Sequence, residues 1–558
     1  MTAEAQAASL AELSSLPSCT LSASQLGDLE LLLSGAFAPL AGFMTDADAA
    51  AVGRSWQLAD GTSFPAVVTL DVPAAALPAA AELSDRILLA DPEGTPIAVL
   101  TIRERTVLRT DELSPGGLGP AGLRDAPYPI AAVDPAQAGV VRLAGPVSAS
   151  RAPEHGPFRR LILTPAASRA ELGDGPVLAF ATRSPLTSRQ IGQIRHLAGQ
   201  LKAQVLILPL VGGRVDVVGS PQALIRAILA AMPGLPPGSR VVVVPLPARP
   251  AAGGLVGPTE SAAASRAREL ALRARVAATY GATHLIADGS APDPVDLPAG
   301  ADLAASAVIP MVPSGDWAYD PRAEVWRPHA LIEAGTEQED LSADQLGDLL
   351  DAGTEIPPWV MPAAVVRELR RVRRPRSERG LVLFLTGLSG SGKSTIARDL
   401  ADVLTERSDR QVSLLDGDLV RQLLSAGLTF SRADRDLNIA RIGYVAAEIA
   451  RHGGIAICAP IAPFAAARAQ VRQMVSEVGD FFLIHVATPI EVCEARDRKG
   501  LYAKARAGVI GQFTGVSDPY EVPADAELVI DTSAVDRPAA VQAVLKMLTS
   551  GGWLAEQG

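Results

Sequence analysis

A glycine-rich loop in the last third of the chain leaves few choices for the fold around it. The segment LVLFLTGLSGSGKSTIARDLADVL occupies residues 381–404 and contains Gly-x4-Gly-Lys-Ser. A β-branched and aromatic apolar run precedes this pattern, and apolar residues at helical spacing follow it. We therefore expect a buried strand, a phosphate-binding loop and a helix, an order typical of parallel α/β sheets.

The loop is suited to binding a nucleoside triphosphate. Glycines allow backbone N–H groups to surround phosphate oxygens, and the N-terminus of the following helix adds a partial positive charge. Lys393 can reach the β- and γ-phosphates, and the Ser394 hydroxyl can ligate Mg²⁺. The residues predicted to hold ATP here are Gly387, Ser389, Gly390, Ser391, Gly392, Lys393, Ser394 and Thr395. The loop does not identify the group that accepts the phosphate.

Composition limits the other partners of the chain. Its 558 residues are 48% hydrophobic and 20% charged, with a net charge of −11. An acidic chain is a poor ligand for nucleic acid or anionic membrane, and no run of about 20 apolar residues suggests a membrane span. The cysteines, Cys19, Cys458 and Cys493, share no metal-ligand spacing. Because the N-terminus lacks a basic start and an apolar stretch, we expect a cytoplasmic protein.

Three regions differ in the order of their predicted strands and helices. Residues 1–155 contain short strand-like runs, such as FPAVVTLDV (64–72), which predict a β-rich domain. From 156 to 375, strand-like runs such as AQVLILPLV (203–211) alternate with helical stretches, which favours a parallel sheet with crossover helices. The same alternation restarts in 376–558. We therefore expect a multidomain α/β protein with these three domains, the last of which is the P-loop domain.

The junction RELRRVRRPRSER (367–379) is rich in arginine. One interpretation is a basic patch for nucleic acid. The other, which the usual behaviour of charge runs favours, is a solvated helix end followed by a linker that is broken at Pro375.

The motifs downstream of the loop are more specific. In order, they are LLDGDLVRQLLSAGLTFSRADRDLNIARIGYVA (414–446), APIAPF (459–464), ATPIEVCEARDRKGLYAKARAG (487–508) and FTGVSDPYEVP (513–523). Together with the loop, this series resembles adenylyl-sulfate kinase (APS kinase) over about residues 380–535. The resemblance implies transfer of the ATP γ-phosphate to the 3′-hydroxyl of adenosine 5′-phosphosulfate (APS), which gives PAPS.

An aspartate after the next predicted strand is the candidate catalytic carboxylate. Asp418 ends the strand-like run VSLLDGD (412–418), so it should lie at the carboxyl edge of the sheet, where open α/β sheets bind ligands. The resemblance implies that Asp418 and Lys393 are catalytic. Asp416 is near enough for the two aspartates to exchange roles, and the structural alternative for Asp418 is a cap of the next helix.

The resemblance also implies an APS-binding set. Arginine suits an acceptor that carries phosphate and sulfate, because its planar fork pairs with such oxyanions. Phe430 and Phe513 match two aromatics that sandwich the adenine, although a lone phenylalanine is usually a core residue. Lys504 and Arg506 lie in the same basic segment as Lys499. The implied substrate-binding residues are Asp418, Arg421, Phe430, Arg435, Asn438, Ile461, Ala462, Lys499 and Phe513, and Arg496 is implied to contact the ATP adenine.

Most of residues 1–375 resembles a second family, ATP sulfurylase. The likeness is carried by LELLLSGAFAPLAGFM (29–44), LADGTSFPAVVTLDV (58–72), LTPAASRAEL (163–172) and LLDAGTEIPPWVMPAAVVRELRR (349–371). It implies a β-rich, PUA-like domain followed by a nucleotidyltransferase-like α/β domain. A sulfurylase joined to an APS kinase would perform two successive steps of sulfate activation.

The catalytic motifs of that second family are degraded here. Its pattern Q-x-R-N-P-x-H-x-x-H reads ATRSPLTSRQ at 181–190, which keeps Arg183 but has Thr187 and Gln190 in place of both histidines. Its second motif, G-R-D-H-A-G, is replaced by ADGSAPDP at 287–294. Losing one electrostatic donor typically costs about 10²–10³ in rate. We therefore expect no sulfate adenylyltransferase activity.

Three side chains of this region have two interpretations each. Arg183 either contacts an anion or is a structural remnant. His196 and His284 lie in apolar helix and strand contexts, which favours structural roles over catalytic ones.

The favoured function is therefore APS kinase with Mg²⁺ and ATP, and with a silent sulfurylase-like region. We expect a homo-oligomer that acts on the small molecule APS and binds neither nucleic acid nor membrane. The alternatives are a bifunctional sulfurylase/kinase, a regulatory protein that only senses PAPS, and a P-loop kinase for another small molecule. The intact GSGKST (390–395) and Asp418 argue against the sensor.

Overall fold

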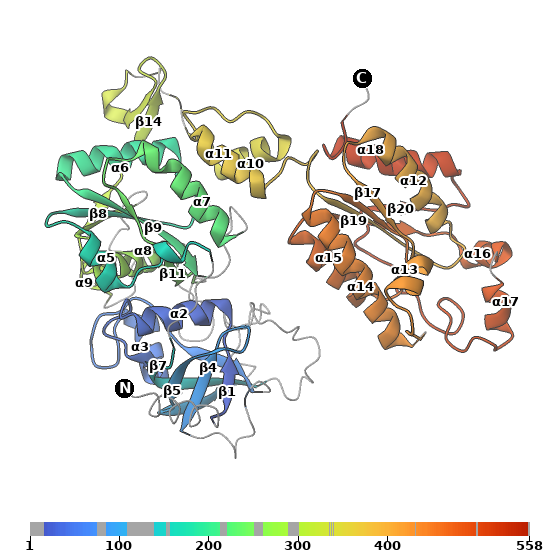
Figure 1. The fold of residues 1–558 in the computed structure, drawn as a ribbon, viewed down its shortest axis with the longest axis horizontal. Helices are drawn as coiled ribbons and strands as arrows, with labels where there is room; N and C mark the ends of the chain where they lie inside the picture. The colour runs from blue at the N-terminus through green and yellow to red at the C-terminus, as the bar shows by residue number, and fades with distance from the viewer. Residues whose placement is uncertain are drawn as a thin grey trace. The chain divides into compact units, whose positions relative to one another are not determined.

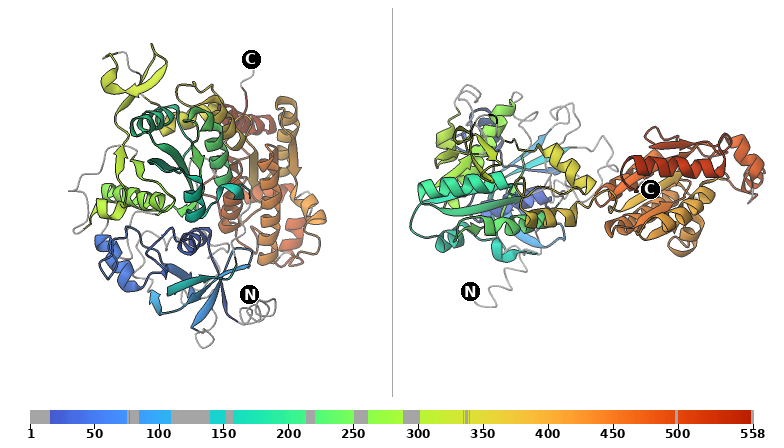
Figure 2. Two further views of the ribbon diagram at one scale, coloured as in Figure 1. Left: turned by 60° about the vertical axis from the view of Figure 1, so that its left-hand side comes forward. Right: turned by 90° about the horizontal axis from the view of Figure 1, so that it is seen from above.

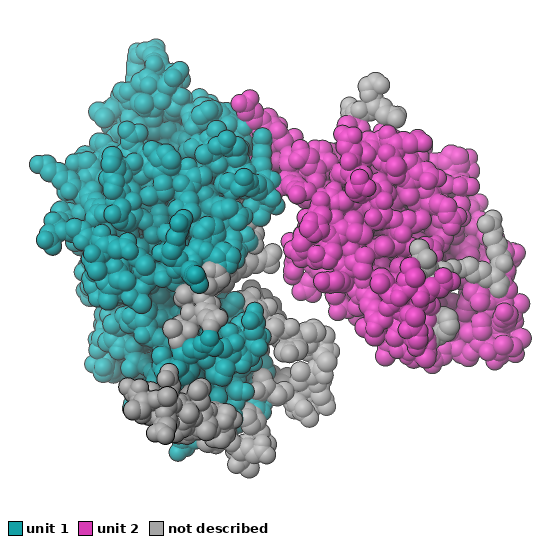
Figure 3. All heavy atoms as spheres, in the orientation of Figure 1, with its two compact units in different colours: residues 1–342, 356–372 teal, residues 343–355, 373–558 magenta. Residues whose placement is uncertain are grey.

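The computed structural model divides the chain into two compact units. Unit 1 contains residues 1–342 and 356–372, and unit 2 contains residues 343–355 and 373–558 (Figures 1 and 3). The residues that the structure describes are 16–74, 77, 85–108, 139–151, 157–212, 220–249, 261–287, 301–333, 335, 338, 340–429, 431–497 and 500–555. The division into domains at 155/156 and 375/376 stays a prediction.

The first part of unit 1 is a mostly antiparallel sheet built around one long strand. Strand β7 pairs antiparallel with β2, β3, β5 and β6, and the sheet continues from β5 through β4 to β1. Helices α2 and α3 begin after the capping side chains of Ser22 and Thr45. The elements are β1 Ser18–Thr20, α2 Ala23–Leu33, β2 Gly42–Phe43, α3 Asp46–Ser55, β3 Leu70–Pro73, β4 Arg86–Ala90, β5 Pro96–Thr101, β6 Glu104–Leu108 and β7 Val140–Ala149.

A six-stranded parallel sheet forms the second part of unit 1. Its order is β10-β9-β8-β12-β13, and β11 also lies beside β9. Strand β8 is buried along its whole length, as expected for a parallel strand. The elements are α5 Pro165–Glu171, β8 Val177–Thr182, α6 Ser188–Leu201, β9 Gln204–Gly212, α7 Pro221–Ala231, β10 Arg240–Val241, β11 Val244–Pro247, α8 Ala262–Thr279, β12 His284–Ala287, α9 Leu303–Ala307 and β13 Met311–Pro313.

Unit 1 ends with a small antiparallel pair and one helix. Strand β14 (Trp317–Asp320) pairs with β15 (Val325–Pro328), and α11 (Ala363–Val372) packs on α7. Trp326 donates its indole N–H to the carbonyl of Trp359 at 2.6 Å, which ties the pair to the chain that leads into α11.

Unit 2 is a five-stranded parallel sheet with helices on both faces (Figures 1 and 2). The strand order is β17-β18-β16-β19-β20, so the first strand of the domain is the central one. Its elements are α10 Ala343–Ala352, β16 Leu381–Thr386, α12 Lys393–Arg407, β17 Val412–Leu415, α13 Gly417–Leu423, α14 Arg432–Arg451, β18 Ile455–Cys458, α15 Ala465–Ser476, β19 Asp480–Val486, α16 Ile490–Arg496, α17 Leu501–Arg506, β20 Leu528–Ile530 and α18 Arg537–Ser550.

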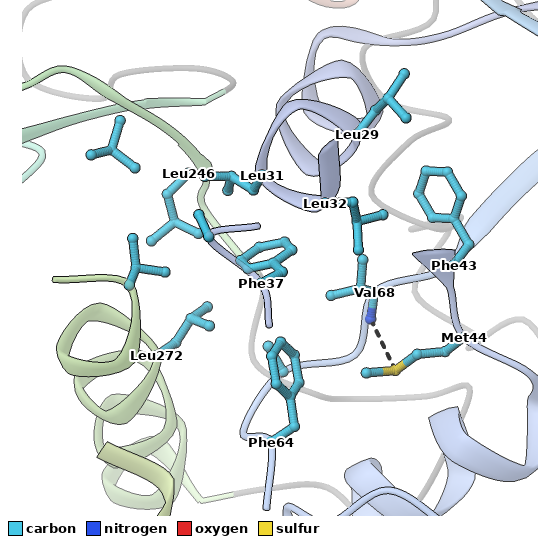
Figure 4. Packing of buried hydrophobic residues seen from close by; sticks show 14 of the residues in the cluster. Leu29, Leu31, Leu32, Phe37, Phe43, Met44, Phe64, Val68, Leu246 and Leu272 are labelled. Carbon is cyan, nitrogen blue, oxygen red and sulfur yellow. Dashed lines mark hydrogen bonds between the residues drawn. The ribbon is translucent and has the colours of Figure 1, made fainter. Parts of the chain in front are cut away.

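The buried cores follow this layering. In unit 1 one hydrophobic cluster runs through both sheet regions, and Figure 4 shows Leu246 beside Leu31 and Phe37. In unit 2 the side chains of β16 alternate between two cores. One core contains residues of α12 and α18, and the other contains residues of α14 and α15. This alternation is the two-residue period of a strand that is covered on both faces.

The arginine-rich junction is neither a free basic patch nor a plain linker. Arg373 binds both carboxylate oxygens of Asp351 at 2.7 and 3.0 Å, and Arg379 binds Asp351 at 2.5 Å. Arg376 donates to the Gly551 carbonyl at 3.2 Å. Burial alone would raise the pKa of Asp351, but the hydrogen bonds from Arg373 and Arg379 outweigh it and lower the pKa to about 2. The charge run therefore holds α10 against the remainder of unit 2.

Candidate active site

The phosphate-binding loop lies at the carboxyl edge of the parallel sheet of unit 2. Strand β16 ends at Thr386, the loop occupies 387–392, and α12 begins at Lys393. Because β16 is flanked by β18 and β19, the loop emerges between the segments that follow those two strands. This is the edge at which open α/β sheets bind ligands.

Two glycines of the loop are required by its close packing. Gly387 has φ +148°, and a Cβ there would come within 2.4 Å of the Val486 carbonyl oxygen. Gly390 has φ +77°, and a Cβ there would come within 2.9 Å of the Cys493 carbonyl oxygen. A side chain at either position would push the loop away from the segments that support it.

The loop presents donors suited to an anion. Gly392 caps α12 in the left-handed conformation and supplies no side-chain cap. Among the residues that the structure describes, no acceptor lies within hydrogen-bond reach of the N–H groups of Gly390, Gly392 and Ser394. Lys393 is buried, and its ammonium donates to the Leu388 carbonyl at 2.7 Å. These groups form the N-terminal donor cluster that binds phosphate in P-loop proteins.

Side chains from three other segments form hydrogen bonds to backbone carbonyls of the loop. The Ser391 carbonyl accepts hydrogen bonds from Thr488 at 3.0 Å and from Thr532 at 2.9 Å. Arg496 binds the Thr532 hydroxyl at 2.7 Å and the Gly390 carbonyl at 3.4 Å. Arg496 thus braces the loop, and its contact with the ATP adenine stays a prediction. The threonines were missed by sequence reasoning, because their pairing with the loop spans more than 90 residues.

Tyr502 provides a further brace. Its hydroxyl donates to the Ser389 carbonyl at 2.9 Å, and its ring is buried. Burial raises the pKa of the phenol, so the hydroxyl keeps the proton that it donates. Tyr502 lies in the KGLYAKAR segment, in which the sequence analysis singled out only basic residues.

Both candidate aspartates lie at the same edge of the sheet. Strand β17 ends at Leu415 rather than at 418, so Asp416 directly follows the strand and Asp418 lies in the first turn of α13. The Asp416 carbonyl accepts the Val420 N–H at 3.0 Å, so Asp416 is the residue at the start of that helix. The assignment of Asp418 as the catalytic carboxylate stays a prediction.

The two expected acceptor-binding residues of α14, Arg435 and Asn438, have largely buried side chains. Arg435 pairs with Asp518, donates to the Thr514 hydroxyl at 3.2 Å and lies over the ring of Phe464 at 5.3 Å. Asn438 is buried, and within the described chain its Oδ1 has no hydrogen-bond donor. A buried amide oxygen without a partner is costly and points to a ligand group at this position. Arg421, on α13, donates to the Thr429 carbonyl at 3.0 Å.

The segment after β18 is held in a strained conformation. Ala462 has φ +43°, which is unfavourable for a residue with a Cβ. The Thr386 hydroxyl donates to the Ile461 carbonyl at 2.6 Å, and Arg468 donates to the Ala462 carbonyl at 2.8 Å. Tyr520 bonds Thr386 at 3.0 Å. These three side chains fix Ile461 and Ala462 beside the phosphate loop.

Of the two residues expected to stack on adenine, Phe513 lies in the described part of the chain. Phe513 is buried and packs edge to face on Tyr502, with ring centroids 5.0 Å apart. This places it in a small hydrophobic cluster with Leu388 of the loop. Phe430 and Lys499 lie outside the described residues. In helix α17, Arg506 pairs with Glu494 at 2.7 Å.

The degraded sulfurylase motif has become a helix cap in unit 1. Thr187 is the N-cap of α6: its hydroxyl accepts the Gln190 N–H at 3.2 Å. The Gln190 side chain in turn accepts the Thr187 N–H at 3.1 Å. The two positions that hold histidines in the sulfurylase pattern thus form a capping box. The signal, T-x-x-Q before a helical run, was present in the sequence.

The Arg183 guanidinium bonds to groups of unit 1. It donates to the carbonyls of Leu246 at 2.7 Å and Pro247 at 2.8 Å and pairs with Glu269 at 3.3 Å. Burial lowers the pKa of Arg183, although Glu269 opposes this effect. His196 lies on the edge of Trp317, and the segment after Ala287 lies outside the described residues. These contacts favour the structural interpretation of Arg183.

Among the described helices, none combines the length and apolar character needed to cross a membrane. Nor does this part of the chain contain a group of three or more His, Cys, Asp or Glu side chains placed to hold a metal ion.

Comparison with known families matches all three regions. The model of adenylylsulphate kinase matches residues 379–531, that of ATP-sulfurylase matches 159–372, and that of a PUA-like domain matches 1–113. The multidomain α/β architecture expected from the sequence is therefore confirmed, including the order of its parts.

Similar proteins share this order over nearly the whole chain. Sulfate adenylyltransferase from Phaeosphaeria nodorum is 37% identical over 98% of this chain and 96% of its own length, and that from Chaetomium globosum is 37% identical over 97% and 95%. The structure of a hexameric APS kinase from Thiobacillus denitrificans is 33% identical, with a TM-score of 0.75 over 100% of this chain and 97% of that one. The chain thus belongs to the family in which a PUA-like domain, an ATP-sulfurylase domain and an adenylylsulphate kinase domain are joined in one protein.

Proposed function

We propose that this protein is an adenylyl-sulfate kinase whose sulfurylase-like region does not make APS. The observation that carries the proposal is a contrast between two helix N-termini. That of α12 keeps N–H groups open to a phosphate, and that of α6 is closed by Thr187 and Gln190. The similar Thiobacillus denitrificans protein is described as an APS kinase, which supports the same activity here.

In the proposed reaction, the 3′-oxygen of APS attacks the γ-phosphorus of ATP. The bond between that phosphorus and the β–γ bridging oxygen breaks, and ADP and PAPS are released. The hydroxyl proton passes to a carboxylate, for which Asp418 is the first candidate and Asp416 the second. Lys393 and the loop N–H groups stabilise the negative charge on the transferring group.

The donor set fits Mg²⁺. This ion usually takes one or two protein oxygens and completes its shell with phosphate oxygens and water. Ser394, in the first turn of α12, offers a hydroxyl, and Asp416 at the end of β17 offers a carboxylate. When bound with ATP, the ion neutralises charge on the phosphates.

The acceptor is proposed to bind beside the loop, between α14 and the Ile461–Ala462 segment. Arg421 and Arg435 supply positive charge for its phosphate and sulfate, and Asn438 supplies the unpartnered amide oxygen. Phe430 and Phe513 would hold the adenine, Lys499 would contact the substrate, and Arg496 would contact the ATP adenine. The Thiobacillus denitrificans protein is hexameric, which supports a homo-oligomer here.

A bifunctional enzyme is the second candidate. It is favoured by the relatives from Phaeosphaeria nodorum and Chaetomium globosum, which are 37% identical over almost the whole chain and are named sulfate adenylyltransferase. It would need other catalytic groups to do the work of the two histidines whose positions Thr187 and Gln190 occupy here. The closed cap at these positions and the internal partners of Arg183 argue against it.

Two assays on the full chain distinguish the candidates. With Mg²⁺, ATP and APS, the proposal predicts PAPS. With Mg²⁺, ATP, sulfate and pyrophosphatase, it predicts no sulfate-dependent phosphate release, even while the protein's own kinase removes APS. The double variant Thr187→His/Gln190→His should stay silent in the second assay. Sulfate-dependent release by the wild type at ordinary turnover would establish the bifunctional enzyme, and PAPS binding without turnover would establish the sensor.

A further inference from the structure

Helix α15 carries a buried arginine close to its N-terminus. Arg468 is 3% exposed, and it is the fourth residue of α15 (Ala465–Ser476). Burying a guanidinium is costly, and the partial positive charge at a helix N-terminus opposes a cation nearby. Within the described chain, the buried Nε of Arg468 has no hydrogen-bond partner. The groups that its other nitrogens hold therefore indicate why a cation stands here.

The Arg468 guanidinium joins two segments that are distant in the sequence. Its Nη1 donates to the Ala462 carbonyl, and its Nη2 donates to the Glu521 carbonyl, both at 2.8 Å. The planar fork of an arginine fixes the relative positions of its donors, whereas a lysine offers a single ammonium. Arg468 thus holds the two carbonyls at a set separation.

The first of these segments has a conformation that needs support. Ala462 has φ +43°, in the region that disfavours residues with a Cβ. The Thr386 hydroxyl donates to the carbonyl of the preceding Ile461 at 2.6 Å. Since that hydroxyl has one proton, Tyr520 is the donor in the 3.0 Å bond between the two hydroxyls. Thr386 and Arg468 thus each hold one carbonyl of this segment.

The second segment, residues 513–521, carries groups that the proposed function places around the acceptor. Phe513 stands at its start, and Thr514 and Asp518 both bond to Arg435 of α14. A shift of this segment would therefore displace an aromatic ring and the partners of a cation together.

Further hydrogen bonds tie the end of the second segment to the start of α15. The Glu521 N–H donates to the Pro463 carbonyl at 2.9 Å, and the Glu521 carboxylate accepts the Ala465 N–H at 2.6 Å. Because Arg468 lies in the same turn as Ala465, its bond to the Glu521 carbonyl adds to a connection that already exists.

The ring of Tyr520 packs against the same guanidinium. Its centroid is 5.9 Å from Cζ of Arg468, a favourable arrangement of a cation and an aromatic ring. His485 stacks on Tyr520, with ring centroids 5.7 Å apart. Burial and the charge of Arg468 lower the pKa of His485, so at pH 7 this imidazole is neutral and adds no second cation. Arg468 is therefore a contact that both segments share.

We propose that Arg468 is a positioning residue that sets the distance between the two segments bordering the acceptor site. The proposal rests on the proposed function, because that function assigns these segments to APS. Arg468 acts through the Ala462 and Glu521 carbonyls and not by touching the substrate. The bonds from Thr488 and Thr532 to the phosphate loop do not involve Arg468, so its loss should affect APS more than ATP.

Steady-state kinetics of the full chain with ATP and APS tests this role. Arg468→Met keeps the apolar stem but bonds neither carbonyl, so the KM for APS should rise about ten-fold or more, as for the loss of a charge-assisted hydrogen bond, while the KM for ATP stays within about two-fold. Arg468→Lys can bond one carbonyl and should raise the KM for APS by a smaller factor.

Arg472→Met is the matched control. Arg472 lies on the same helix, and it bonds the Glu527 carboxylate at 2.6 Å and the Asp525 carbonyl at 3.0 Å, which belong to neither segment. Its replacement should leave both KM values unchanged.

A purely structural arginine would give a different pattern. Its loss would lower the fraction of folded enzyme, and so the apparent kcat, without changing either KM. That result, or an equal rise of both KM values, would overturn the proposal. If Arg468→Met fails to fold, Arg468→Lys carries the test, with an unchanged KM for APS as the contrary outcome. A wild type that forms no PAPS would overturn the proposed function and this inference together, which distinguishes it from a working kinase whose Arg468 variants bind APS normally.

Discussion

The loops 183–187 and 387–392 occupy the same place in a strand–loop–helix connection, but they treat the N-terminus of the following helix in opposite ways. Each connects a buried parallel strand to a helix: β8 to α6 in unit 1, and β16 to α12 in unit 2. In the first, the Thr187 hydroxyl accepts the Gln190 N–H, and the Gln190 side chain accepts the Thr187 N–H. In the second, a glycine caps the helix without any side-chain bond. The difference shows that a helix N-terminus can bind an anion only while the protein leaves its donors unused.

The largest effect should come from removing the cation of the open loop. Lys393→Ala should reduce PAPS formation by about 10²–10³ or more, because a positioned charge at the transferring phosphate is lost. Turnover with ATP and APS measures this, and Lys546→Ala, at an exposed position of α18, is the matched control. Near-wild-type turnover of a folded Lys393→Ala protein would remove the loop from the active site.

A smaller effect is expected for the adenine-stacking residues, whose removal should weaken binding of APS more than binding of ATP. If Phe513 stacks on the acceptor adenine, Phe513→Ala should weaken APS binding by about 1–3 kcal/mol and ATP binding much less. Phe430→Ala should behave in the same way. Phe513 also packs on Tyr502, which braces Ser389. Calorimetric titration with each nucleotide decides between the roles, since equal losses for both would assign Phe513 to packing.

Removing the side-chain cap of α6 should lower the stability of unit 1 and leave kinase turnover unchanged. Thr187→Ala removes the N-cap of α6 and should lower the free energy of unfolding of unit 1 by about 1 kcal/mol. Urea unfolding followed by tryptophan fluorescence measures this, because four of the five tryptophans lie in unit 1. Kinase turnover should stay at the wild-type level. A loss of turnover in the folded variant would mean that the sulfurylase-like region takes part in the kinase reaction.

The smallest expected effect depends on pH and concerns unit 2 alone. The pKa of Asp351 is lowered from 3.8 to about 2 in the folded state, so its ion pairs stabilise unit 2 above pH 4 and lose that effect as pH falls from 4 to 2. Asp351→Asn should therefore destabilise unit 2 at pH 7 by at most about 1 kcal/mol, after allowance for solvent screening. Pulse proteolysis in urea at pH 7, 5 and 3 checks this. A difference between variant and wild type that grows at pH 3 would contradict the assignment.

Local patterns predicted the strands and loops better than the pairing of strands. The run 381–404 became β16, the loop and α12 as expected, because strand, glycines and helix are all local signals. The run 64–72 predicts one strand, yet only Leu70–Pro73 pairs with β7. Phe64, Ala66 and Val68 are nonetheless fully buried. Alternating apolar residues predict that one face of a segment is buried, but they do not predict whether another strand pairs with it.

The chemistry of the site was predictable where it depended on one short motif. Lys393 and the loop glycines stand where the pattern required. The braces from Thr488, Thr532 and Tyr502 were missed, because nothing local in the sequence tells a threonine which distant carbonyl it will bond. The capping box at Thr187 is a local pattern, T-x-x-Q before a helical run, and it was therefore predictable from the sequence.

The route of the chain between the units has a practical consequence for dissection. Residues 343–355 belong to unit 2, whereas 356–372 belong to unit 1. A protease that cuts once within 356–372 would leave α10 attached to one fragment and its partner arginines on the other, still joined through Asp351. A fragment starting at 376 would keep Arg379 without that carboxylate. A kinase domain excised at a sequence boundary should therefore be less stable than the same residues within the whole protein.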